Sequence, residues 1–172
     1  MGHELRDLFG EWDGDHADRR SEAAFPEEAD ETRRRQVVLR EAHMVGVFEQ
    51  RRTGAGAGKA FVLLEDKDGR RVPIWVGEFE AYAIASGDTR PNDRPATHDL
   101  LRRVIEQMGG RVVRVYVDDL WQETFYAKIT VLQSGAETDI DCRPSDAIAL
   151  AVRTGAPIYV AENVLEAASR SA

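Results

Sequence analysis

The feature of this sequence that most constrains its fold is an internal similarity at an offset of 66 residues. Gly69 aligns with Gly135, Glu80 with Asp146, and the matching continues along an Ala-rich segment. The other matching pairs are Ile74 with Ile140, Ala81 with Ala147, Ala83 with Ala149, Ile84 with Leu150 and Ala85 with Ala151. Because each copy reads as strands joined at a glycine turn and followed by a helix that opens with an acid, we predict a duplicated β-β-β-α unit.

Hydrophobic periodicity predicts the elements of this unit and its neighbours. Alternating apolar residues indicate strands at 36–50, 60–66, 70–76, 111–117, 124–132, 137–141 and 157–160. Helices are expected at 78–87, 97–108, 144–153 and from 162 onward. Leu100, Leu101, Val104, Ile105 and Met108 form the apolar face of the helix that joins the two copies. The predicted fold class is α+β, with one twisted, largely antiparallel or mixed sheet and helices packed on it.

The N-terminal segment has a different composition. Residues 13–35 are polar and charged, and such a stretch cannot bury enough apolar surface to offset its ordering entropy. Leu5, Leu8, Phe9 and Trp12 precede it with the spacing of one helical face. We therefore predict a mostly disordered tail at 1–35, with a short amphipathic helix at 4–12 that docks on its own domain or a protein partner, and a folded domain at 36–172.

Composition limits where in the cell the protein is expected and how it could bind nucleic acid. No apolar run is long enough to span a membrane, and the first residues lack the pattern of a signal peptide. The single cysteine, Cys142, excludes an internal disulfide. Together these features predict a cytoplasmic protein. Residues 36–172 hold 20 acidic and 17 basic residues, so the domain lacks the strongly basic surface typical of nucleic-acid binding by counterion release.

The candidate site residues are carboxylates with basic neighbours. Glu78 and Glu80 open one repeat helix, Asp141 lies on the strand before the other, and Arg143, Ser145 and Asp146 open that second helix, while His98 and Asp99 fall in the first turn of the joining helix. Oxygen ligands that hold Mg²⁺ or Mn²⁺, together with an Arg that neutralises phosphate, are what a phosphodiesterase needs. The same acids could instead only stabilise helix N-termini or form salt bridges.

Several motifs resemble the bifunctional nuclease family. They are VPIWVGEFEAYAIA, RPATHDLL, ETFYAKI, IDCRPSDAIALAVR and PIYVAENVL, and they occur in order between about residues 37 and 167. The resemblance implies an α+β domain, homo-oligomers and nuclease activity on DNA and RNA. The signature positions here are Glu78, Glu80, His98, Asp99, Arg143, Ser145 and Asp146. Two departures are Gln122-Glu123, where the family usually has Asp-Gly, and Cys142, where it usually has Ala.

Two functional hypotheses remain open at this point. In the first, the protein is a nuclease whose catalytic residues are Glu78, Glu80, His98, Asp99, Asp141 and Asp146. Arg143 and Ser145 would bind substrate, and Glu80, Asp141 and Asp146 would hold Mg²⁺ or Mn²⁺. In the second, the protein is a non-catalytic regulatory or ligand-binding module, and these residues maintain the fold and the oligomer.

The sequence also predicts assembly into a homodimer or larger oligomer. Val112 and Tyr116 lie on the face of their strand opposite Val113, Val115 and Val117, and Tyr126 and Leu132 lie opposite the core row of the next strand. Both faces of this hairpin are partly apolar, so either helices of the same chain or a second copy would have to cover the second face.

Overall fold

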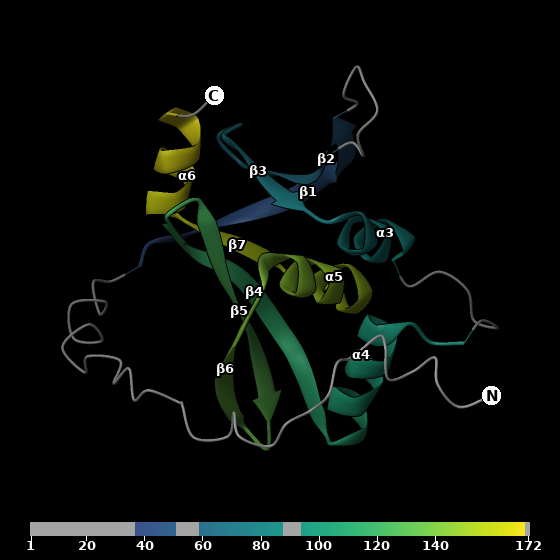
Figure 1. Cartoon of the computed structure of the whole chain (residues 1–172). Coiled ribbons are helices and arrows are strands. Elements are labelled where there is room, and N and C mark those ends of the chain that lie inside the picture. The colour runs from purple at the N-terminus through teal and green to yellow at the C-terminus, as the bar shows by residue number, and fades with distance from the viewer. Residues whose placement is uncertain (1–36, 51–58, 88–93, 171–172) are drawn as a thin grey trace, which may run out of the picture. The chain divides into compact units, whose positions relative to one another are not determined.

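A computed structural model describes residues 37–50, 59–87 and 94–170, all of which belong to one unit that spans 37–172. The predicted tail at 1–35 and its helix at 4–12 lie outside the described residues. The elements are β1 (Leu39–Gln50), β2 (Lys59–Asp66), β3 (Arg71–Val76), α3 (Glu78–Ser86), α4 (Thr97–Gln107), β4 (Gly110–Trp121), β5 (Thr124–Gln133), β6 (Ala136–Cys142), α5 (Pro144–Thr154), β7 (Ile158–Ala161) and α6 (Glu162–Arg170). Figure 1 shows their arrangement.

A single seven-stranded sheet runs in the order β3-β2-β1-β7-β4-β5-β6. Every neighbouring pair is antiparallel except β4 and β7, which are parallel. The short strand β7 therefore joins two antiparallel meanders, β1–β3 and β4–β6, at the centre of the sheet. This mixed sheet with helices confirms the predicted α+β class.

The core lies between the sheet and its helices. Val62 in β2 pairs with Ile74 in β3, and Val117 in β4 pairs with Ala127 in β5; all four side chains are buried. Because side chains alternate along a strand, the neighbours of these residues point to the other face of the sheet. The helices α3, α5 and α6 complete the core with Ile84, Ile148, Leu150, Val164 and Leu165, all of them fully buried.

The strand-strand-strand-helix order occurs twice, as β1-β2-β3-α3 and β4-β5-β6-α5. Gly69 and Gly135 both have positive φ, of 79° and 83°, in the turns before the third strand of each set. The equivalence is incomplete, since Ile74 is buried whereas Ile140 is exposed. The duplication itself stays a prediction.

The helix α4 differs from what its periodicity suggests. Its apolar positions lie on one face, but only Ile105 packs against the core. Four of the five predicted positions are exposed, namely Leu100, Leu101, Val104 and Met108. On the hairpin β4–β5, Val112 and Tyr116 are buried within the chain, whereas Tyr126 is exposed. Among the described helices none has the length and hydropathy that a membrane crossing requires.

Candidate functional site

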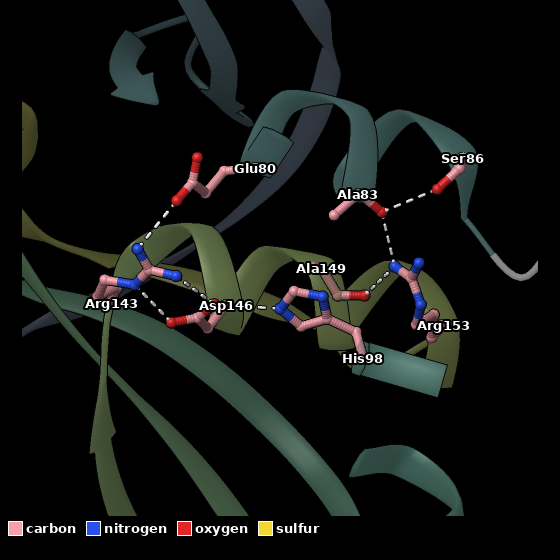
Figure 2. Close-up of polar contacts among 8 residues, drawn as sticks. All are labelled: Glu80, Ala83, Ser86, His98, Arg143, Asp146, Ala149 and Arg153. Carbon is pink, nitrogen blue, oxygen red and sulfur yellow. Dashed lines mark hydrogen bonds and ion pairs between the residues drawn. The ribbon is translucent and has the colours of Figure 1, made fainter. Parts of the chain in front are cut away.

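The candidate site forms where the first turns of three helices meet around Arg143. Arg143 is the N-cap residue of α5, and its guanidinium reaches back across the start of that helix to Asp146. Nε donates to Asp146 Oδ2 at 2.8 Å, and a terminal nitrogen donates to Asp146 Oδ1 at 3.1 Å. The other terminal nitrogen donates to Glu80 Oε1 in the first turn of α3, at 3.0 Å. One cation thus bridges two carboxylates from different helices, as Figure 2 shows.

His98 extends this chain from the third helix, α4. Its Nε2 lies 3.1 Å from Asp146 Oδ1, so Asp146 contacts both Arg143 and His98 (Figure 2). Burial opposes ionisation of Asp146, but the hydrogen bonds and charges of Arg143 and His98 outweigh it and lower the pKa of this carboxyl below its ordinary value. The same carboxylates raise the pKa of Arg143, chiefly through the hydrogen bond to Asp146. Asp146 is therefore the ionised centre of the cluster.

A buried arginine ties the three helices together beside this cluster. The side chain of Arg153 is only 1% exposed. Its Nε donates to Asp99 Oδ1 at 2.5 Å, and one terminal nitrogen donates to the carbonyl oxygens of Ala83 and Ala149 at 2.9 and 3.0 Å (Figure 2 shows the two carbonyl contacts). Asp99 also accepts from the backbone N–H of Ala96, at the start of α4. Asp99 thus has a structural partner at each oxygen.

An open pocket of about 320 Å³ lies on one side of Arg143. Glu80, Arg143 and Ser145 border it from the helix starts, and Trp75 and Phe125 border it from β3 and β5. Glu123, in the turn between β4 and β5, also lines it. The side chain of Arg143 is 65% exposed, which makes it the accessible cation of this pocket. His98 and Asp146 do not line the pocket and contact Arg143 or one another behind it.

Gly77 leaves room for the Glu80 carboxylate. Gly77 is the N-cap residue of α3, and a Cβ built at this position would overlap Glu80 Oε2. The backbone of Gly77 has φ −71°, which any residue can adopt, so space and not conformation favours glycine here. A side chain at position 77 would displace the carboxylate that Arg143 holds.

The remaining sequence candidates lie apart from this chain of contacts. Glu78 is exposed at the first position of α3, and Ser145 is buried although it borders the pocket. Asp141 is directly opposite Lys128, whereas its neighbour Cys142 is opposite the buried Ala127. Asp141 therefore points to the outer face of the sheet, away from α5.

That outer face carries a second polar cluster around Asp139. Tyr116 donates to Asp139 Oδ2 at 2.5 Å, and Thr130 donates to Asp139 Oδ1 at 2.6 Å. Burial opposes ionisation of Asp139, yet these hydrogen bonds lower its pKa.

Burial and the carboxylates of Asp146 and Asp141 raise the pKa of the Cys142 thiol to about 12, which is opposite to what a nucleophilic cysteine requires.

The metal ligands expected from the sequence do not form a common site. Glu80 and Asp146 flank the Arg143 guanidinium, which lies where a shared cation would have to bind, and Asp141 is on the other face of the sheet. Within the described part of the chain, no three His, Cys, Asp or Glu side chains are grouped to hold a metal ion. The geometry is that of an arginine shared between two carboxylates.

The residues predicted from the sequence include Glu80, His98, Arg143 and Asp146, which the structure brings into contact. Four further residues of the site were not predicted. Trp75 and Phe125 border the pocket, Gly77 leaves room for Glu80, and Arg153 anchors the helices. Only Gly77 had a local signal, because a glycine one residue before a helix is a favoured N-cap residue. Trp75 and Phe125 come from β3 and β5, which are not neighbours in the sheet, and no local pattern predicts that they border one pocket.

Comparison with known proteins shows which family this chain resembles. The model of the bifunctional nuclease domain matches residues 62–172. Uncharacterized protein Rv1829 of Mycobacterium tuberculosis (strain ATCC 25618 / H37Rv) is 43% identical over 108 residues, which are 60% of this chain and 63% of that protein. Bifunctional nucleases 2 and 1 of Arabidopsis thaliana are 33% and 32% identical over 106 residues.

These matches cover only part of each relative. The aligned region is 59% of this chain but only 32% and 33% of the two Arabidopsis proteins, and it is under two thirds of the mycobacterial one. The matched segment contains Glu80, His98, Arg143 and Asp146, so the whole chain of contacts around Arg143 falls inside the family domain. The chain belongs to the bifunctional nuclease domain family.

Proposed function

We propose that this protein is a nuclease that hydrolyses phosphodiester bonds of DNA or RNA at the pocket beside Arg143. The observation that carries the proposal is an exposed guanidinium and a carboxylate, Arg143 and Glu80, side by side in the wall of an open pocket. The family membership of the chain and the printed names of the plant relatives support the same activity.

Arg143 is suited to bind the scissile phosphate. A guanidinium has five N–H donors, and the contacts with Asp146 and Glu80 use three of them. One N–H on each terminal nitrogen is left, and these two can donate to a pair of phosphate oxygens. As negative charge builds up on the phosphate oxygens during attack, this fixed donor pair stabilises the transition state.

Glu80 is the pocket carboxylate placed to act as a general base. Its side chain is 27% exposed, and Oε1 is held by Arg143. A water molecule beside this carboxylate would transfer a proton to it while its oxygen attacks phosphorus, and the bond from phosphorus to the leaving oxygen would break. The leaving oxygen would take a proton from solvent, because the pocket is open.

His98 and Asp146 act as positioning residues in this scheme. Asp146 holds the guanidinium through two hydrogen bonds, and His98 holds Asp146. The roles expected from the sequence for His98 as a catalytic residue and for Glu80, Asp141 and Asp146 as metal ligands are not needed. No step passes through Mg²⁺ or Mn²⁺, because the residues present do not fit such an ion.

Cleavage of an end-labelled oligonucleotide by purified variants tests this proposal. Glu80→Gln keeps the size of the side chain but removes its basicity, and we expect the rate to fall by about 10²- to 10⁴-fold. Arg143→Ala is expected to lower the rate by about 10²- to 10³-fold. Glu41→Gln, an exposed carboxylate on β1, is the matched control and keeps the wild-type rate.

The rival hypothesis of a non-catalytic module predicts another pattern. Folded wild-type protein would cleave no DNA or RNA, or any cleavage would survive both Glu80→Gln and Arg143→Ala unchanged and would then trace to a contaminant. Either result would contradict the proposed function.

A further inference from the structure

Three aromatic side chains form a row on the outer face of the β1–β3 meander. Phe48 is directly opposite Phe61 on the neighbouring strand, and Phe61 is directly opposite Trp75 on the next. The ring centroids of Phe48 and Phe61 are 5.5 Å apart, and those of Phe61 and Trp75 are 5.1 Å apart. The row thus crosses three strands in register and ends on the edge strand β3.

This row is open to solvent instead of being packed in the core. Val62 and Ile74, the neighbours of Phe61 and Trp75, point inward, so the aromatic rings point outward. Phe48 is 41% exposed and Trp75 is 49% exposed. Lys59 places its ammonium 6.0 Å from the centroid of the Trp75 ring, which adds a cation beside the aromatic surface.

The row is continuous with the pocket of the proposed active site. Trp75 ends the row and also lines the pocket that holds Arg143 and Glu80. Phe125 lines the same pocket from β5. The aromatic row and the pocket beside Arg143 therefore meet at Trp75.

The charge of the domain favours stacking over phosphate neutralisation. Residues 36–172 have a small excess of acidic over basic residues, so a duplex held by many phosphate contacts is disfavoured. Stacking on aromatic side chains requires an unpaired base with an open face, and it works with any base. In a duplex, neighbouring base pairs already cover those faces.

We propose that the row Phe48–Phe61–Trp75 and the adjoining pocket bind single-stranded nucleic acid, with an unpaired base stacked on Trp75 and its phosphate on Arg143. This inference rests on the proposed function and names its substrate class. It assigns substrate binding to Trp75, a residue outside the chain of contacts around Arg143.

Binding measured without cleavage tests this inference. The full-length Glu80→Gln variant is titrated into labelled oligothymidylate and oligouridylate of about ten nucleotides, and into a duplex of the same length, with anisotropy as the readout. We expect saturable binding of both single strands and weaker binding of the duplex. Adding Trp75→Ala should weaken single-strand binding by about 5- to 150-fold, the range for loss of one stacked aromatic.

Two controls make the result specific. Tyr82→Ala removes another exposed aromatic, on α3, and should leave the affinity unchanged. In a chain carrying Trp12→Phe and Trp121→Phe, Trp75 is the only tryptophan, and a stacked base should quench its fluorescence. Because few phosphates take part, the slope of log affinity against log salt should be shallow, about −1.

The outcomes separate this inference from the proposed function. If Trp75→Ala binds single strands as well as its parent does, or if the duplex binds equally well, the inference is wrong even where cleavage is observed. If Trp75→Ala instead dissociates an oligomer and leaves binding intact, the row is an interface between copies and the inference is also wrong. If Trp75-dependent binding occurs but the wild type cleaves nothing, the proposed function is wrong, whereas binding of single strands at this surface is supported.

Discussion

At the scale of single residues, two arginines on α5 have different tasks. Arg143 lies at the start of the helix with most of its side chain exposed, and it holds Glu80 and Asp146. Arg153 lies one residue before the end of the helix with its side chain buried, and it holds Asp99 and two backbone carbonyls. The exposed arginine can still receive a ligand, whereas the buried one fixes the helices that carry the site.

Replacing Arg153 should destabilise the protein strongly. Arg153→Met leaves the largely buried Asp99 carboxylate without its cation, and the free energy of unfolding should fall by about 3–5 kcal/mol. The double variant Asp99→Asn with Arg153→Met should cost less than the sum of the single variants, because the two residues interact directly. Urea denaturation followed by circular dichroism measures both. A change below about 0.5 kcal/mol in Arg153→Met would contradict a structural role.

The residues of the site show what local sequence can and cannot predict. Arg143 and Asp146 are three positions apart at a helix start, so their contact could be expected from helical geometry. That Asp141 does not contact Arg143 could also have been predicted, because Asp141 and Cys142 are neighbours on one strand and only one of them can face the core. The contact between Arg143 and Glu80 spans 63 positions, and only the packing of α3 on α5 decides it.

At the scale of elements, the turn between β2 and β3 is joined to the start of α6 by ion pairs. Arg70 in that turn pairs with both Asp66 and Glu162, and Arg40 on β1 also pairs with Glu162, at 2.6 Å. The hydrogen bonds from Arg70 and then Arg40 lower the pKa of Glu162 to about 2. These contacts tie the C-terminal helix to the first meander.

This cluster predicts an acid-sensitive contribution to stability. Because the pKa of Glu162 is about 2 in the folded state and 4.5 ordinarily, its ion pairs stabilise the fold above pH 4.5 and are lost as the pH falls toward 2. The thermal midpoint of Glu162→Gln should therefore lie below that of the wild type at neutral pH, and the gap should close on acidification. Thermal melts across this range measure it. A gap that stays constant down to pH 2 would contradict the assignment.

The exposed face of α4 is where we expect the predicted oligomer to form its contact. Leu100, Leu101, Val104 and Met108 form one apolar strip, and a surface strip of this kind is typical of an interface. We expect a dimer of the 19.2 kDa chain in sedimentation velocity at micromolar concentration. Leu100→Lys with Val104→Lys should yield a folded monomer. A monomeric wild type would contradict the oligomer that the sequence predicts.

The elements themselves were largely predictable, but what covers them was not. Alternation along RVVRVYV and TFYAKITVL identified β4 and β5, because a half-buried strand requires that pattern. The periodicity of α4 identified an amphipathic helix equally well, yet its apolar strip is exposed in the single chain. An apolar face predicts that something covers it and does not say which molecule does so.

At the scale of the whole molecule, strands from opposite ends of the sheet border one pocket, and the helices that follow them, α3 and α5, pack on each other. The first meander supplies the aromatic row, and the second meander with α5 supplies Arg143 and Phe125, and the pocket lies where they meet. The activity proposed for this pocket is cleavage of single-stranded nucleic acid by an arginine and a carboxylate, without a metal ion held by Glu80, Asp141 and Asp146.

The most direct test is the cleavage of matched single-stranded and duplex oligonucleotides by the purified chain in the presence of EDTA. We predict that single strands are cut under these conditions, that the duplex is cut at least about tenfold more slowly, and that Arg143→Ala loses the activity. Two results would contradict this prediction. One is loss of all cleavage in EDTA with recovery on adding Mn²⁺. The other is a rate on the duplex, or a rate of Arg143→Ala, equal to the wild-type rate on single strands.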